Sequence, residues 1–146
     1  MNKSDIFHKF SDGLEFKPDI GRIKKLGEVF TPYPIVVKMI KDIGISKDKS
    51  YATVLEPASG HGNFGVEILK FKIKKVLKEI KEDNIPDQEF TKEYEIRSLL
   101  ALASLYSNDI DKQNIQELKQ RYSRYMSMLY LKYSKKVLNS VYLQEN

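Results

Sequence analysis

The stretch from Glu56 to Gly65, EPASGHGNFG, constrains the fold more than any other part of the chain. It contains the spacing G-x-G-x-x-G at Gly60, Gly62 and Gly65, and it directly follows a short β-favouring run at residues 52–55. Glycine accepts positive φ angles and lets the backbone approach a ligand closely, and a helix that begins after such a turn directs its N-terminus at that ligand. The spacing alone is weak evidence, but a strand before it and a helix after it are the context that a ligand-binding loop requires.

The rest of the chain predicts an alternation of helices and strands, because apolar residues recur at helical spacing between short β-favouring runs. The expected elements are, in order, a helix capped by Thr31 and stopped at Gly44, a strand at 52–55, a helix at 63–82, a helix at 92–103, a strand at 104–108 and a helix from about 111 to 138. This order favours an α/β domain with a parallel sheet. Two strands are fewer than a doubly wound domain usually has, so the chain resembles the opening part of such a fold.

The type of ligand is restricted by Glu56, which stands just before the glycine-rich loop. A carboxylate there would repel a pyrophosphate, whereas it would suit a ligand that carries an ammonium or sulfonium charge. A NAD-type dinucleotide is therefore a weaker alternative. A structural glycine turn that binds no ligand also remains open.

A second carboxylate, Asp109, is expected at the end of the second strand, in the segment LYSNDID. At that place a carboxylate can accept both hydroxyls of a ribose. Asp109 follows Gly65 by 44 residues, whereas the acidic residue of an ordinary dinucleotide fold follows the glycines by about 20. An inserted pair of helices is therefore needed between them. Asp111, taken alone, is interpreted as a helix cap.

Composition excludes several classes of chemistry. The chain has no cysteine, and its histidines are His8 and His61, so disulfides, cysteine zinc sites and thiol catalysis are excluded and a histidine metal cluster has little material. No apolar run approaches the roughly 18 residues of a membrane helix, and the N-terminus is too polar for a signal peptide. We therefore expect a cytoplasmic protein with no metal and no membrane segment.

The net charge of +5 is concentrated in residues 119–146, where six Lys and Arg residues face Glu145 alone. Tyrosines are interleaved with these cations at positions 122, 125, 130 and 133. Such a segment can contact phosphates and stack on bases. A solvated helix face is the favoured interpretation of the charges. For the stripe Leu118, Tyr122, Tyr125 and Leu129, packing on the protein's own sheet is favoured over contact with another chain.

Three segments, GEVFTP, EPASGHGNF and LYSNDID, occur in this order over residues 27–111. Together they resemble the N-terminal half of the S-adenosylmethionine-dependent DNA adenine-N6 methyltransferases of bacterial restriction-modification systems, above all the modification subunits of type I systems and the fused type II enzymes. The family's own segments resemble GxxxTP, D/E-P-A-x-G-x-G-N-F and Y-G-I/V-D/E-I-D. The resemblance implies a Rossmann-like methyltransferase fold, with a helical N-terminal segment at 1–46 and a partial cofactor-binding domain at 47–146.

The resemblance also implies S-adenosylmethionine as the cofactor and DNA as a partner. Thr31 and Pro32 would help to hold the methionine end, while Glu56 and the backbone around 58–62 would surround its amino and carboxyl groups. Asp109 would bind the ribose hydroxyls, and Ile110 would lie against adenine. The complete expected set of cofactor-binding residues is Thr31, Pro32, Glu56, Pro57, Ala58, Gly60, Gly62, Asn63, Phe64, Asp109 and Ile110.

Three positions depart from the family's pattern. His61 replaces a small polar residue, and Ser107 and Asn108 replace a glycine and an apolar residue. Phe64 is expected below the cofactor, although an ordinary core aromatic would give the same pattern.

The family's catalytic motif is absent. In that motif a polar residue is followed by Pro-Pro and an aromatic residue, and it holds a flipped adenine. The five prolines here stand at 18, 32, 34, 57 and 86, and no two are adjacent. We therefore expect no catalytic residue in this chain, with the catalytic and DNA-reading parts beyond residue 146 or on another polypeptide. The alternative is a non-catalytic protein that binds the cofactor or a partner and has a regulatory or interaction role.

Overall fold

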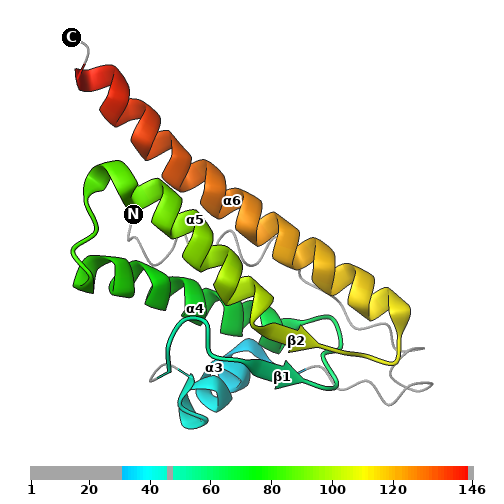
Figure 1. The fold of residues 1–146 in the computed structure, drawn as a ribbon. Coiled ribbons are helices and arrows are strands. Elements are labelled where there is room, and N and C mark those ends of the chain that lie inside the picture. Colours follow the sequence, from blue (N-terminus) through cyan, green and yellow to red (C-terminus); the bar gives the residue numbers. More distant parts are fainter. Residues whose placement is uncertain (1–30, 46–47, 145–146) are drawn as a thin grey trace. The chain divides into compact units, whose positions relative to one another are not determined.

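Two short parallel strands and four helices make up the part of the chain that the structure describes (Figure 1). They are α3 (Tyr33–Asp42), β1 (Val54–Glu56), α4 (Asn63–Glu82), α5 (Asp87–Ala103), β2 (Leu105–Ser107) and α6 (Lys112–Gln144). The computed structural model describes residues 31–45 and 48–144, with side chains up to residue 133. The helical opening expected at residues 1–30 lies outside the described residues.

β1 pairs with β2 in parallel, with Val54 opposite Leu105 and Glu56 opposite Ser107. The predicted parallel pairing is thus confirmed for these two strands. Both are three residues long. β1 begins two residues later and ends one residue later than the predicted run 52–55, and β2 lies within the predicted run 104–108. α5 leads directly into β2. Between them, the N–H of Ser104 donates to the carbonyl of Leu100 and completes the last turn of α5.

α3 begins after Pro32 instead of after a capping Thr31, so the predicted cap was wrong. Pro32 has an extended conformation, and its carbonyl accepts the first helical hydrogen bonds from the N–H groups of Ile35 and Val36. The predicted stop is confirmed at Gly44, whose φ of 75° leaves the helix. α3 packs against α4 within one compact unit, Thr31–Asn146.

The apolar face predicted for α3 is only half covered. Val36 and Ile40 are buried against Ile68 of α4, whereas the side chains of Ile35, Met39 and Ile43 are exposed. Among the described residues, α3 packs chiefly against α4, and Val54 and Leu105 of the sheet join the same cluster, so only a narrow stripe of the helix is covered.

α5 begins five residues earlier than the predicted start at Lys92. Pro86 stands at the N-cap, and Asp87 and Glu89 occupy the first turn, where carboxylates interact favourably with the helix dipole. The stretch 83–91 has the composition of a loop and was predicted as one, but its Pro86, Asp87 and Glu89 form the start of the helix.

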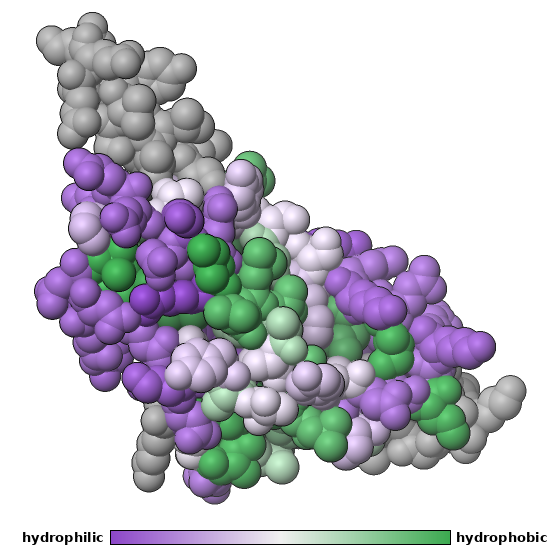
Figure 2. Space-filling model, viewed as in Figure 1, coloured by the Kyte–Doolittle hydropathy of each residue, from purple (hydrophilic) through white to green (hydrophobic). Residues whose placement is uncertain are grey.

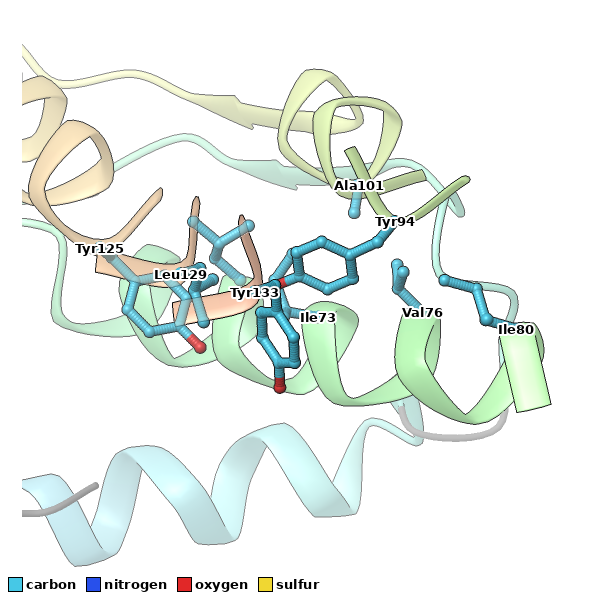
Figure 3. Packing of buried hydrophobic residues seen from close by; sticks show 9 residues of the cluster. Ile73, Val76, Ile80, Tyr94, Ala101, Tyr125, Leu129 and Tyr133 are labelled. Atoms are coloured by element: carbon cyan, nitrogen blue, oxygen red, sulfur yellow. The ribbon is translucent and has the colours of Figure 1, made fainter. Parts of the chain in front are cut away.

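α4 lies at the centre of the larger hydrophobic cluster. Side chains from α4, α5 and α6 meet there (Figure 3), namely Leu69, Ile73, Val76, Ile80, Tyr94, Ala101, Tyr125, Leu129 and Tyr133. The rings of Tyr94 and Tyr133 have centroids 4.4 Å apart. The stripe on α6 therefore packs within its own chain, as predicted, but mainly against α4 and α5 instead of on the sheet, which it reaches through Tyr122 and Ser107. Because Tyr125 and Tyr133 are buried, these two rings are not placed to stack on bases.

No described helix combines the length and the apolar character that a membrane crossing requires.

A buried lysine joins the amino ends of the two strands. Lys72 is only 2% exposed. Its ammonium group donates to the carbonyls of Ser50 (3.0 Å) and Ala52 and to the hydroxyl of Ser104 (2.7 Å). Ser50 is held in turn by the Glu79 carboxylate, which accepts its N–H at 3.0 Å and its hydroxyl at 2.7 Å. Burial lowers the pKa of Lys72, and Asp48 raises it by a smaller amount. This network fixes the entry to β1 against α4.

We predict that Lys72→Met lowers the free energy of unfolding by about 1–3 kcal/mol, because the buried acceptors lose their donor. Urea unfolding followed by circular dichroism measures the loss. Lys74→Met, on the exposed side of the same helix, is the matched control and is expected to change stability by less than about 0.5 kcal/mol. A Lys72→Met variant as stable as the parent would show that the network does not stabilise the fold.

Candidate functional site

The loops that follow β1 and β2 lie side by side at the carboxyl end of the sheet. The N–H of Asn108 donates to the carbonyl of Glu56 at 2.9 Å, and the N–H of Ser59 donates to the carbonyl of Asn108 at 2.8 Å. The parallel ladder therefore continues beyond the last strand residues. It brings the glycine-rich loop, residues 57–62, next to the segment 108–111.

Asp109 holds these two segments together. Its Oδ2 accepts the N–H of Gly60 at 2.8 Å, and its Oδ1 accepts the N–H of Asp111 at 2.9 Å and the amide of Asn114 at 3.2 Å. Burial raises the pKa of Asp109, but the hydrogen bonds from Asp111, Gly60 and Asn114 and the nearby His61 outweigh it, so the pKa is lowered overall. Asp109 is therefore a fixed negative charge with part of its acceptor capacity already in use.

Glu56, at the end of β1, has a contrasting environment. Its Oε2 is shielded from solvent and has no hydrogen-bond partner among the described residues. Burial raises the pKa of Glu56 to about 7, Asp109 raises it slightly, and hydrogen bonds involving Ser107 and the backbone of Gly65 lower it. Near neutral pH this carboxyl group is therefore poised between its two protonation states.

The three glycines of the G-x-G-x-x-G spacing, two in the loop and Gly65 in the first turn of α4, have different roles. Gly60 and Gly62 have φ angles of 50° and 84°, which favour glycine. A Cβ at Gly60 would meet open space, whereas a Cβ at Gly62 would lie 2.0 Å from Cδ1 of Leu118. A Cβ at Gly65 would lie 2.2 Å from the hydroxyl of Tyr122. Two of the three glycines are therefore required by the close approach of α6.

α6 also makes polar contacts with the loop. Nη1 of Arg121 donates to the carbonyl of His61 at 2.7 Å and to Oδ1 of Asn63 at 2.9 Å. Nδ1 of His61 lies 2.9 Å from the Glu117 carboxylate, and the Tyr122 hydroxyl lies 3.1 Å from that of Ser107. None of these α6 residues was predicted to lie next to the loop. The helical spacing of residues 118 and 122 is visible in the sequence, but the sequence does not show which segment they pack against.

The structure brings together Glu56, Gly60 and Asp109 of the predicted site. Pro57 and Ala58 are exposed on the loop. Ile110 projects from the neighbouring segment with 98% of its surface exposed. An exposed apolar residue beside a loop of this kind is available to a ligand.

Other predicted positions have structural partners. Asn63 is bonded to Arg121, Gly62 lies against Leu118, and Phe64 packs against the cluster of Val36, Ile40 and Ile68. Phe64 thus has the position of a core aromatic.

Thr31 and Pro32 lie at the start of α3, and no hydrogen bond joins them to the two loops among the described residues. The described residues also contain no group of three or more His, Asp, Glu or Cys side chains arranged to hold a metal ion.

Comparison of the chain with protein-family models, with curated proteins and with solved structures gives no match.

We predict that Glu56 makes stability fall as the pH rises. A carboxyl group with a raised folded-state pKa contributes stability that is fully present below the unfolded value of 4.5 and is lost as the pH rises through about 7. Glu56→Gln removes this dependence, so the variant should become more stable than the parent at pH 8, by on the order of 1 kcal/mol after allowance for partial exposure. Chemical unfolding at pH 4, 6 and 8 measures the difference, and Glu95→Gln should retain the slope. An identical slope in Glu56→Gln and the parent would contradict the assignment.

We predict that Gly62→Ala destabilises the protein more than Gly60→Ala. Both pay the left-handed backbone cost of about 1–2 kcal/mol, but alanine at Gly62 also overlaps Leu118, which adds about 1–3 kcal/mol. Urea unfolding of both variants measures the two losses. In a Leu118→Ala background the loss from Gly62→Ala should fall to that of Gly60→Ala, and equal losses in the parent background would contradict close packing of α6.

Proposed function

We propose that this chain is the S-adenosylmethionine-binding part of a DNA adenine-N6 methyltransferase with a Rossmann-like fold. One observation carries the proposal. Glu56 and Asp109 lie at the carboxyl ends of adjacent parallel strands, with the glycine-rich loop bonded to Asp109 and with Ile110 exposed next to it. Ligands of open α/β sheets bind at this end of the strands.

The residues present fit the chemistry of this cofactor. S-adenosylmethionine carries cationic groups, a ribose diol and an adenine ring. The unpaired Oε2 of Glu56 lacks a compensating positive charge, Asp109 retains acceptor capacity for hydroxyl groups, and Ile110 offers an apolar surface to a planar ring. When bound, the cofactor would supply the methyl group, while these residues would bind and orient it.

An exposed sheet face supports the proposal that another stretch of polypeptide completes the domain. Leu55 and Tyr106 are register partners, and they are 68% and 57% exposed. Figure 2 shows further hydrophobic surface over α5 and near β1 and α3 on the side in view. Parallel sheets are usually covered on both faces. We propose that the covering polypeptide carries the catalytic and DNA-reading residues.

The same exposed face favours a second candidate function, a non-catalytic protein that binds the cofactor or a partner. In that case the partner surface is the sheet face and not the stripe on α6, because Leu118, Tyr125 and Leu129 of that stripe are buried in this chain. This function would be favoured if the chain binds the cofactor and no second polypeptide combines with it to give methyl-transfer activity.

We predict saturable binding of S-adenosylmethionine in calorimetric titration of the purified chain. Ile110→Ala should weaken binding roughly tenfold, because about 1–2 kcal/mol of apolar contact is lost. The substitution should leave the melting temperature unchanged, since Ile110 is almost fully exposed. Leu131→Ala, a second exposed apolar residue, lies on α6 away from the loop and is the matched control with parental affinity.

Two outcomes would overturn the proposed function. One is the absence of any heat with S-adenosylmethionine, and the other is binding that Ile110→Ala and Leu131→Ala affect equally. Saturable binding of NAD without a response to S-adenosylmethionine would support the dinucleotide alternative instead.

A further inference from the structure

Arg121 connects α6 to the glycine-rich loop across a gap of about 60 residues in sequence. Its Nη1 donates to the carbonyl of His61 and to the side-chain oxygen of Asn63, so the guanidinium spans Gly62. The N–H of Gly62 donates to the carbonyl of Ser59 at 2.8 Å. The peptide unit between His61 and Gly62 is therefore held at both ends, its carbonyl by Arg121 and its N–H by Ser59.

This restraint acts at the place where the loop has the most freedom. Gly60 and Gly62 both adopt positive φ, a region that glycine enters and leaves readily. Without the donor at its carbonyl, the peptide unit after His61 could rotate and redirect the neighbouring N–H groups. A hydrogen bond from a charged donor is stronger than a neutral one, and a planar guanidinium fixes the direction of both acceptors.

The environment of Arg121 fits a fixed role. Burial lowers its pKa, and Glu117, Glu67 and Tyr122 oppose that effect. Arginine nevertheless remains protonated in proteins. A largely buried cation held by the carbonyl of His61 and the side-chain oxygen of Asn63 has few alternative positions.

We propose that Arg121 is a positioning residue that holds the glycine-rich loop in its ligand-binding conformation, together with Asp109 at Gly60. The inference rests on the proposed function in so far as the ligand is S-adenosylmethionine. Arg121 contacts the loop and not the ligand. α6 thereby becomes part of the site, although it contributes no residue to the predicted set.

The test compares Arg121→Met with Arg121→Lys and with Arg124→Met, an exposed arginine on the same helix. Amide hydrogen exchange by NMR reports on Gly60 and Gly62 in each variant, and calorimetry with S-adenosylmethionine reports on affinity. Arg121→Met should accelerate exchange at both glycines at least tenfold and weaken binding about tenfold, while core amides such as that of Ala101 keep their protection. Arg121→Lys should recover part of both effects, and Arg124→Met should match the parent.

Equal acceleration across the whole chain, or unchanged exchange at Gly60 and Gly62, would overturn the inference. If Arg121→Met does not fold, Arg121→Lys and Asn63→Ala decide, since each removes part of the contact without leaving the site uncharged. If the parent does not bind S-adenosylmethionine, the proposed function fails, and the exchange data alone judge the role of Arg121 in the loop.

Discussion

Parallel pairing of β1 with β2 is the constraint on which the rest of the structure depends. Parallel strands need a crossover connection, and here it consists of α4 and α5. The two helices occupy most of the interval between Gly65 and Asp109, which are 44 positions apart in sequence. Their packing against one another creates the surface that α6 covers. The pairing also places the glycine-rich loop beside Asp109, so one ladder determines both the core and the candidate site.

The two ends of this small sheet are stabilised by different means. At the amino end, Lys72 supplies donors to Ser50, Ala52 and Ser104, and Glu79 holds Ser50 in place. At the carboxyl end, Asp109 supplies acceptors to backbone N–H groups. A strand of three residues offers few ladder bonds of its own, so charged side chains with several hydrogen-bond partners each help to fix its register. Such charges stabilise only while every partner is present.

The extent to which the sequence predicts this structure depends on the kind of signal. α4 has the predicted bounds because its apolar residues recur regularly between Gly62 and Asp83. α5 begins earlier than predicted because Pro86, Asp87 and Glu89, residue types that are frequent in loops, form the start of this helix. The glycine spacing that marks the loop is visible in the sequence. The reason why positions 62 and 65 need glycine is not, because it lies in the close approach of Leu118 and Tyr122. Contacts between segments 56 residues apart leave no local signal.

The contrast between the two carboxylates at the site follows from their donors. Asp109 receives backbone N–H groups from both sides, so its charge is favoured and its pKa is lowered. Glu56 is shielded, and its Oε2 has no partner among the described residues, so burial dominates and its pKa is raised. A cation beside these two carboxylates would find Asp109 already ionised, because its hydrogen bonds stabilise the charge without neutralising it. It would lower the pKa of Glu56 and release a proton near neutral pH. Of the two, Glu56 is therefore the side chain whose protonation would change with a nearby charge, while Asp109 keeps the two loops together.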